Sequence, residues 1–166
     1  MSKPTVSLAR NADHLTAANV PFSIRVLRRL NPLIMGLLRS PLHGLLSRNL
    51  LVLTYAGRTT GTRYSLPLSY VARGENLYLC TRTAFWWRNL RDGKPVEVYV
   101  RGRRVTMVPS VLDPRSSEAL AGLTAFLTVN PGTGEKLYDV RRGRDGAPLP
   151  SDLEREVVRS VVVRLA

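Results

Sequence analysis

Two segments of the sequence concentrate side chains that could bind a ligand. The first reads GRTTG over residues 57–61 and is followed by Arg63 and Tyr64. Glycines free backbone N–H groups, and threonine hydroxyls and guanidinium groups add donors, which together suit an anion such as a phosphate group. An ordinary hairpin with solvated arginines has the same composition, so the segment alone leaves both interpretations open.

The second segment reads FWWRNL over residues 85–90 and contains both tryptophans of the protein. A tryptophan is costly to expose, so Trp86 and Trp87 either pack in a core or lie beside a planar aromatic ligand. Arg88 and Asn89 follow directly and offer polar contacts to such a ligand. The residue types fit both alternatives.

Several other chemistries lack the residues they need. Cys80 is the one cysteine, which excludes an intramolecular disulfide, and neither His14 nor His43 is spaced to form a zinc site with it. We therefore expect no metal. The G-x-S-x-G elbow of many hydrolases does not occur. The stretch NPGTGEK at residues 130–136 departs from a phosphate loop, because a glutamate precedes its lysine and a leucine follows it.

The chain is strongly basic. Its 166 residues include 25 Lys and Arg against 12 Asp and Glu, a formal net charge of +13, and its length and 44% hydrophobic content fit one globular domain. Nucleic acid, an anionic membrane surface and a polyanionic small ligand would each account for this charge. Because the sequence has no basic helix motif and no aromatic series along a strand, nucleic acid is not an expected partner.

The elements that must position these segments are mostly strands. Tight turns predict an α+β fold whose six antiparallel strands curl into a barrel or are covered by helices, with one helix inserted before the last strand. The expected strands cover residues 50–56, 64–72, 77–81, 96–101, 104–112 and 157–165. Gly102-Arg103 is the expected two-residue turn of a hairpin. Asp113-Pro114 is expected to cap the inserted helix, which ends near residues 130–132.

The N-terminal part of the sequence differs from the strand region in composition and in the spacing of its apolar residues. Residues 1–20 indicate a flexible arm and residues 21–48 an amphipathic helical segment, which leaves 49–166 for the barrel domain. Within the helical segment, residues 22–39 combine arginines with apolar side chains at helical spacing. This stretch either packs on the barrel domain or lies on a membrane surface. No stretch reaches the roughly 18 apolar residues that span a bilayer. We expect a cytoplasmic protein, which the second alternative would place peripherally at the inner membrane face.

The order and spacing of three motifs resemble a known family. They are Gly57-Arg58-Thr59-Thr60-Gly61, a central Pro67-Leu68 in the next strand, and Trp86-Trp87-Arg88-Asn89-Leu90. In these motifs the chain resembles the deazaflavin-dependent nitroreductase and quinone reductase family of actinobacteria, over about residues 45–112. The resemblance implies a split β-barrel that binds the reduced 8-hydroxy-5-deazaflavin coenzyme F-420, with FMN as the less favoured cofactor. The net positive charge of the chain would then suit the coenzyme's phosphate and oligoglutamate tail.

The resemblance also implies the residues of the site and the reaction. The expected coenzyme contacts are Arg58, Thr59, Thr60, Tyr64, Ser65, Pro67, Thr81, Arg82, Thr83, Trp86, Trp87, Arg88 and Asn89. Hydride would pass to an electron-poor acceptor, such as a quinone or a nitro compound, and Tyr138 or Arg82 could donate a hydrogen bond or proton to it.

One departure from the family pattern supports an alternative. Residues 82–84 are shorter than the Gly-rich loop of many relatives, which favours a non-catalytic split-barrel protein that holds a lipid, haem or another flavin. By analogy with family members of this size, a homodimer is also expected.

Overall fold

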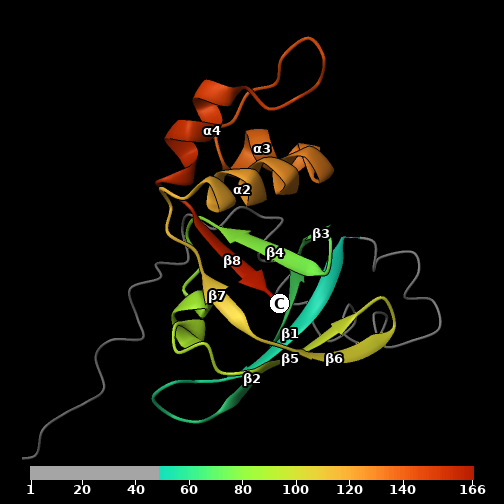
Figure 1. The fold of residues 1–166 in the computed structure, drawn as a ribbon, viewed down its shortest axis with the longest axis vertical. Helices are drawn as coiled ribbons and strands as arrows, with labels where there is room; N and C mark the ends of the chain where they lie inside the picture. The colour runs from blue at the N-terminus through green and yellow to red at the C-terminus, as the bar shows by residue number, and fades with distance from the viewer. Residues whose placement is uncertain (1–48) are drawn as a thin grey trace, which may run out of the picture.

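Eight strands and three α-helices make up residues 49–166, the part of the chain that the computed structural model describes (Figure 1). The strands are β1 (Leu50–Ala56), β2 (Arg63–Ser69), β3 (Val71–Arg73), β4 (Asn76–Thr81), β5 (Val96–Val100), β6 (Arg103–Met107), β7 (Pro109–Val111) and β8 (Val161–Leu165). The helices are α2 (Ser117–Val129), α3 (Pro131–Leu137) and α4 (Pro150–Val157), preceded by the 3-10 helix η2 (Trp86–Leu90).

The strands form two antiparallel sheets of four, ordered β2-β1-β5-β6 and β3-β4-β8-β7. The α+β fold with antiparallel strands is confirmed, but the prediction of six strands was wrong. Residues 64–72 break between β2 and β3, and residues 104–112 break between β6 and β7. At both breaks the chain passes from one sheet to the other, as strands do at the corners of packed sheets. A continuous apolar pattern does not reveal such a bend.

The hairpin of β5 and β6 has its turn one residue earlier than predicted. Val100 pairs with Arg103, so Arg101 and Gly102 form the turn, with φ angles of 48° and 77°. Positive φ at both positions is the geometry of a type I′ turn, whose twist matches that of the strands. The prediction of Gly102-Arg103 assumed that glycine must come first, whereas an arginine occupies the left-handed conformation here.

The main core lies between the two sheets. Leu51 and Leu53 from β1, Val98 from β5, and Leu79 and Val163 from β4 and β8 are all fully buried in it. Trp86 and Leu90 of η2 pack against the same cluster. This core fixes η2, and with it the second predicted ligand-binding segment, against the sheets.

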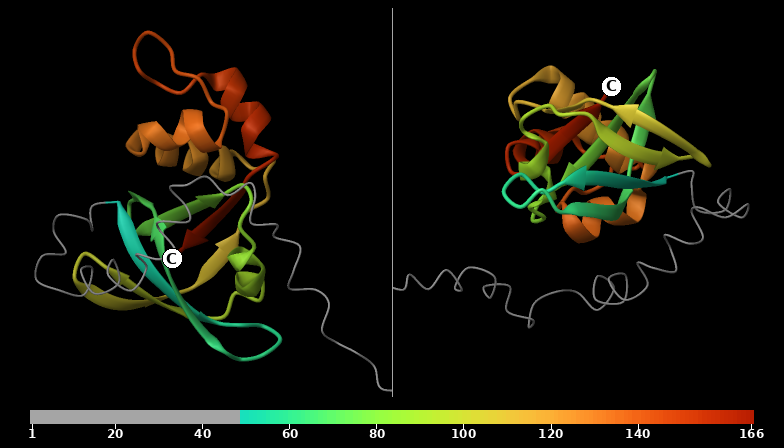
Figure 2. Two further views of the ribbon diagram at one scale, coloured as in Figure 1. Left: turned by 180° about the vertical axis from the view of Figure 1, so that it is seen from behind. Right: turned by 90° about the horizontal axis from the view of Figure 1, so that it is seen from below.

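A second core joins the outer face of the β4-β8 sheet to the helices. Figures 1 and 2 show α2, α3 and α4 together at one end of the molecule, next to β4 and β8. Tyr78 and Val162 of the sheet pack with Leu123 and Phe126 of α2. The approach is close at Gly122, where a Cβ atom would lie 2.8 Å from Cδ1 of Tyr78. A glycine at this position therefore allows α2 to rest on the sheet.

The helices begin and end differently from the prediction. Ser116, rather than Asp113-Pro114, is the N-cap of α2, and its hydroxyl accepts a 3.1 Å hydrogen bond from the backbone N–H of Ala119. Asp113 instead accepts from the N–H of Arg115 in a preceding turn. The expected last strand, 157–165, is shorter, because α4 extends to Val157 and β8 begins at Val161. Val157, the first of its β-branched residues, ends the helix instead and packs into the second core.

Helix α4 is anchored by a buried carboxylate. Asp152 is fully buried, and the backbone N–H, Nε and Nη2 of Arg141 donate to it at 3.0, 2.9 and 3.0 Å. Arg155 adds an ion pair at 3.0 Å. The hydrogen bonds from Arg141 hold the pKa of Asp152 well below its ordinary value. Residues 141–149 are thereby tied to the start of α4.

Asp152→Asn is expected to lower the melting temperature by several degrees at pH 7. Because the folded pKa is depressed, the stabilisation is present above the carboxyl's unfolded pKa, about 3.9, and is lost as the pH falls through the folded value. The difference between wild type and variant should therefore shrink as thermal unfolding is followed from pH 7 toward pH 3. Asp92→Asn, which disrupts an exposed pair with Lys94, is the control and should change little. A gap that stays constant with pH would contradict the assignment.

The predicted arm at 1–20, the helical segment at 21–48 and the membrane contact at 22–39 lie outside the described residues. Within residues 49–166, the helices are too short or too polar to cross a bilayer.

Candidate functional site

The GRTTG segment forms a closed loop between β1 and β2. The N–H of Gly57 donates to the carbonyl of Thr62 at 2.7 Å, and the N–H of Gly61 donates to the carbonyl of Gly57 at 2.8 Å. A Cβ on Gly57 would lie 2.9 Å from Cε2 of Tyr64, so glycine lets this ring lie against the loop. The loop projects at the end of the molecule away from the helices, and η2 lies between the two (Figure 1).

One side chain connects the two predicted ligand-binding segments. Oδ1 of Asn89 accepts a 3.0 Å hydrogen bond from the backbone N–H of Arg58, and its Nδ2 donates to the carbonyl of Trp86 at 3.3 Å. The residues lie 31 positions apart in the chain. The sequence predicted that the two segments contribute to one site, and this contact brings them together.

The loop retains unused donors. Within residues 49–166, the backbone N–H groups of Thr59 and Thr60 take part in no hydrogen bond, and the Arg58 guanidinium forms no ion pair. Both threonines and Arg58 are exposed. Two free amides beside a free guanidinium are the donor set that binds a phosphate or carboxylate.

The residues that carry these donors line a shallow pocket of about 370 Å³. Its walls are Tyr55, Gly57, Arg58, Thr59, Thr60, Tyr64, Phe85, Trp86 and Asn89. The rings of Tyr55 and Tyr64 pack at a tilt of 30° with centroids 5.7 Å apart. Phe85 is 55% exposed, and the Arg88 guanidinium lies 4.5 Å from its ring centroid. The sequence interpretation missed Tyr55 and Phe85, although Phe85 directly precedes the predicted tryptophans.

A second, more enclosed pocket of about 290 Å³ lies between the sheets and the helices. Its walls are Leu68, Ser69, Cys80, Thr81, Arg82, Thr83, Ala84, Trp86, Phe126, Thr133, Leu137 and Tyr138. The short segment 82–84 turns tightly here, since the N–H of Ala84 donates to the Thr81 hydroxyl at 3.1 Å. Trp86 lines both pockets, so one indole separates the loop pocket from the helix-side pocket.

Four of the predicted coenzyme contacts lie outside both pockets. The Ser65 hydroxyl is hydrogen bonded to that of Thr54 at 2.8 Å, and Pro67 is paired with Val52 in the sheet. Trp87 faces another hollow, where Arg91 lies 4.6 Å from its ring centroid. Arg88 does not line the loop pocket itself, but its guanidinium lies over the ring of Phe85, which does. The coenzyme roles of these residues stay predictions, and the structure gives each of them another contact.

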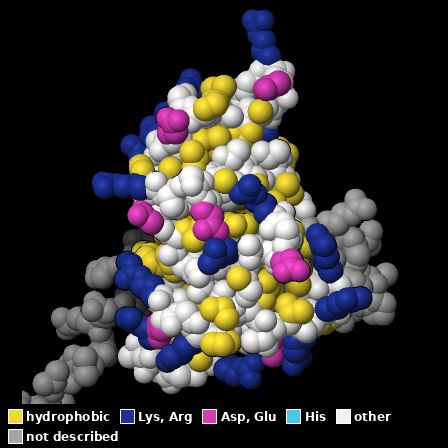
Figure 3. Space-filling view, in the orientation of Figure 1, with side chains coloured by type: hydrophobic (Ala, Val, Ile, Leu, Met, Phe, Trp, Pro, Cys, Tyr) yellow, Lys and Arg dark blue, Asp and Glu magenta, His cyan; other side chains and the backbone are white. Residues whose placement is uncertain are grey.

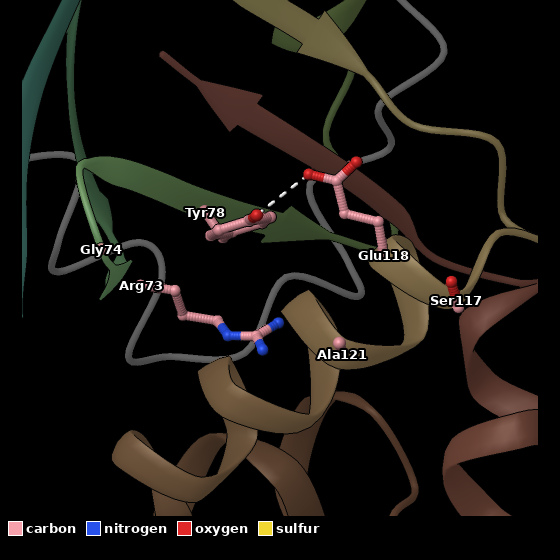
Figure 4. Close-up of a pocket in the computed structure, with 6 residues that line it drawn as sticks. All are labelled: Arg73, Gly74, Tyr78, Ser117, Glu118 and Ala121. Carbon is pink, nitrogen blue, oxygen red and sulfur yellow. Dashed lines mark hydrogen bonds between the residues drawn. The ribbon is translucent and has the colours of Figure 1, made fainter.

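Another hollow, of about 760 Å³, lies beside α2 and contains none of the predicted residues (Figure 4). Its polar groups already pair with one another. The Tyr78 hydroxyl donates to Glu118 at 2.9 Å, Arg164 donates to the same carboxylate at 3.1 Å, and Arg73 lies over the Tyr78 ring. It is therefore a weaker candidate than the two pockets that meet at Trp86. No cluster of His, Cys, Asp or Glu in residues 49–166 could hold a metal ion.

The overall arrangement matches known structures. No protein-family model and no curated protein matches the chain. Among solved structures, an F420-H2 dependent reductase aligns with a TM-score of 0.52 at 15% identity, covering 73% of this chain and 96% of the other. The chain has the fold of this reductase.

Two further structures align with this chain. A protein described as a domain-swapped dimer has a TM-score of 0.55 at 13% identity and covers 87% of this chain and 99% of its own. A conserved hypothetical protein from Mycobacterium tuberculosis has a TM-score of 0.50 at 17% identity and covers 72% and 73%. At such identities the likeness shows the fold alone, and the function has to be argued from the site.

In the helix-side pocket, Tyr138 is buried at 3% exposure. Burial, followed by the nearby Cys80 and Glu156, raises the pKa of its hydroxyl far above the ordinary value, while Arg82 opposes the shift. Within the described residues this hydroxyl takes part in no hydrogen bond. It is therefore a protonated donor available to a ligand.

The other predicted acceptor-side residue, Arg82, is held by a carboxylate that the sequence interpretation missed. Its Nε forms a 3.3 Å ion pair with Oε1 of Glu156, whose side chain is 1% exposed. The last strand was expected to begin at residue 157, so Glu156 was assigned to no expected element. Its position three residues after Leu153, on the buried face of α4, is the signal that could have revealed it.

Proposed function

We propose that this protein is an oxidoreductase that binds a reduced deazaflavin coenzyme and reduces an electron-poor acceptor such as a quinone or a nitro compound. The observation that carries the proposal is the pair of pockets that meet at Trp86. The loop pocket presents free hydrogen-bond donors for an anion. The helix-side pocket presents an apolar lining and the protonated hydroxyl of Tyr138. The shared fold with an F420-H2 dependent reductase supports the same assignment.

The residues of the loop pocket fit an anionic, ring-bearing coenzyme. The amides of Thr59 and Thr60 and the guanidinium of Arg58 would hold a phosphate, and Trp86 would flank the ring. A bound reduced deazaflavin supplies hydride chemistry, while the protein supplies orientation and electrostatics.

The helix-side pocket suits the acceptor. Leu68, Phe126 and Leu137 give it an apolar part against which a ring-bearing acceptor would pack. As an acceptor gains hydride, negative charge develops on its oxygen, and the Tyr138 hydroxyl and Arg82 would donate hydrogen bonds to it. Because burial raises the pKa of Tyr138, we assign its hydroxyl as a hydrogen-bond donor rather than the source of the proton.

The proposal extends to assembly. The structure described as a domain-swapped dimer shares this fold, and we propose a homodimer for this chain as well. Light scattering of the purified protein would test it, with a mass of twice 18.5 kDa expected. A monomeric mass at micromolar concentration would contradict the dimer without affecting the site.

The experiment that tests the function is a titration of the full chain with reduced coenzyme F-420, followed by tryptophan fluorescence. We expect saturable quenching in the micromolar range, because Trp86 lines both pockets. Trp87→Phe should keep the signal, since Trp87 faces another hollow. FMN titrated in parallel should bind more weakly.

Arg58→Gln is expected to weaken coenzyme binding about tenfold, the usual effect of losing one hydrogen bond to a charged group. Arg115→Gln removes the same charge from an exposed position away from both pockets and should leave the affinity unchanged. Failure of the wild type to bind the coenzyme would refute the proposal. Copurified lipid, haem or FMN would then favour the ligand-binding alternative that the short 82–84 segment suggested.

A further inference from the structure

Arg82 is the one charged side chain among the residues that line the helix-side pocket. Its guanidinium is fixed on two sides. Nε pairs with Oε1 of Glu156 at 3.3 Å, and Nη1 donates to the carbonyl of Leu137 at 3.4 Å. Within the described residues Nη2 has no partner, so this nitrogen remains available to a ligand.

Glu156 lies behind Arg82 rather than in the pocket wall. Its side chain is almost completely buried, and Oε1 also accepts a 3.0 Å hydrogen bond from the Ser160 hydroxyl. Oε2 has no hydrogen-bond partner in the described part of the chain. A carboxylate buried with a spare oxygen is costly, which makes a purely structural role a poor explanation for it.

The pair determines the electrostatic character of the pocket. Arg82 alone would give the pocket one uncompensated positive charge, which attracts anions. With Glu156 directly behind the guanidinium, the pair has no net charge, so a ligand that is not in direct contact feels little attraction. A ligand in contact with Nη2 of Arg82 can still accept a hydrogen bond from it. A cavity of this kind disfavours a ligand that arrives with a full negative charge.

We propose that Glu156 determines the specificity of the helix-side pocket, selecting an uncharged aromatic acceptor over an anionic one by neutralising Arg82. The inference rests on the proposed function, in which this pocket receives the acceptor. Glu156 acts through Arg82 and is a positioning residue that touches no ligand itself. It retains Arg82 as a hydrogen-bond donor without making the pocket a general anion site.

The test compares two ligands with one ring system, 2-(hydroxymethyl)anthraquinone and anthraquinone-2-sulfonate. Their binding to the full chain without coenzyme is measured by calorimetry. The wild type should bind the neutral quinone more tightly. Glu156→Gln keeps a hydrogen-bond acceptor for Ser160 but removes the charge, so sulfonate affinity should rise about tenfold while neutral-ligand affinity stays within about twofold.

Two further variants separate charge from structure. Glu154→Gln removes the same charge from an exposed position of α4 and should change neither affinity. Arg82→Gln should lower the sulfonate affinity relative to the neutral quinone about tenfold, because Glu156 is then unbalanced. The double variant Arg82→Gln/Glu156→Gln should restore the wild-type ratio. If Glu156→Gln alone does not fold, the tenfold shift between the Arg82→Gln and double variants tests the same claim.

The outcomes distinguish this inference from the function on which it rests. A shift of both ligands by the same factor in Glu156→Gln, or an unchanged ratio in the folded variant, overturns the charge-balance role while the coenzyme titration still stands. If neither quinone binds the wild type, the inference falls together with the acceptor pocket. Absence of coenzyme binding leaves the quinone measurements unaffected, because they contain no coenzyme.

Discussion

Tyr138→Phe is expected to lower the turnover number with a quinone acceptor about a hundredfold while leaving the affinity for the coenzyme within about twofold. The hydroxyl would stabilise charge that develops only during the transfer, so its loss should affect kcat rather than ground-state binding. The ring itself is retained, and its edge-on packing against Phe126 at a centroid distance of 6.2 Å is retained with it. Since the hydroxyl has no partner within the described residues, the variant leaves no buried group unpaired and should melt at the wild-type temperature.

The measurement is stopped-flow oxidation of the reduced coenzyme by a neutral quinone, with coenzyme affinity taken from fluorescence. Tyr99→Phe, which removes a hydroxyl from β5 outside both pockets, is the matched control and should turn over normally. Because burial holds the pKa of Tyr138 above its ordinary value of 10.0, wild-type turnover should not fall between about pH 7 and pH 10 through loss of this proton. Equal turnover in wild type and Tyr138→Phe would remove the hydroxyl from the mechanism.

The part of the site that could be predicted from sequence is the part made of local motifs. Gly57 and Asn89 each belong to a short segment whose residue types indicate their use, and the structure brings these segments into contact. Tyr138 was predicted for its chemistry and lies in the helix-side pocket. For Gly57 and Asn89 the order and spacing of the motifs carried the information, and for Tyr138 the chemistry of its hydroxyl did.

What could not be predicted depends on three-dimensional packing. Glu156 acquires its role only because the fold brings α4 to the segment that directly follows β4, which places its carboxylate next to Arg82. Trp86 and Trp87 are neighbours in sequence, yet one lines both pockets and the other faces a third hollow, because η2 directs consecutive side chains in different directions. No local pattern distinguishes the two tryptophans.

The bends in the sheets were missed for a related reason. Residues on both sides of Tyr70 have strand-like patterns, and only the pairing of β2 with β1 and of β3 with β4 shows that the chain changes sheets there. Pairing partners are set by contacts between residues distant in sequence, which an alternation of apolar side chains does not encode.

The distribution of charge does not indicate a function either. Lys and Arg side chains are spread over the face shown in Figure 3, with acidic side chains between them.

Asn89→Ala is expected to weaken coenzyme binding about thirtyfold. The substitution removes the acceptor for the Arg58 N–H and the donor to the Trp86 carbonyl, and together these bonds are worth about 2 kcal/mol where they hold a binding loop in place. The loop would keep its internal bonds from Gly57 to Thr62 and from Gly61 to Gly57, so the two amides would still form a donor pair. They would no longer be held at a fixed distance from Trp86, and binding would have to restore that order at an entropic cost.

The quantity that decides this prediction is the affinity measured by coenzyme titration, compared with the melting temperature of the same sample. Arg91→Ala is the control, because Arg91 follows η2 immediately but stacks on Trp87 at the far side, and it should bind the coenzyme like the wild type. Since the Arg58 end of the contact is exposed, Asn89→Ala should lower the melting temperature by only a few degrees. A variant that melts early and binds normally would mean that Asn89 supports the core rather than the loop. A loss of affinity in a stable variant would show that the two motifs act as one site through this side chain.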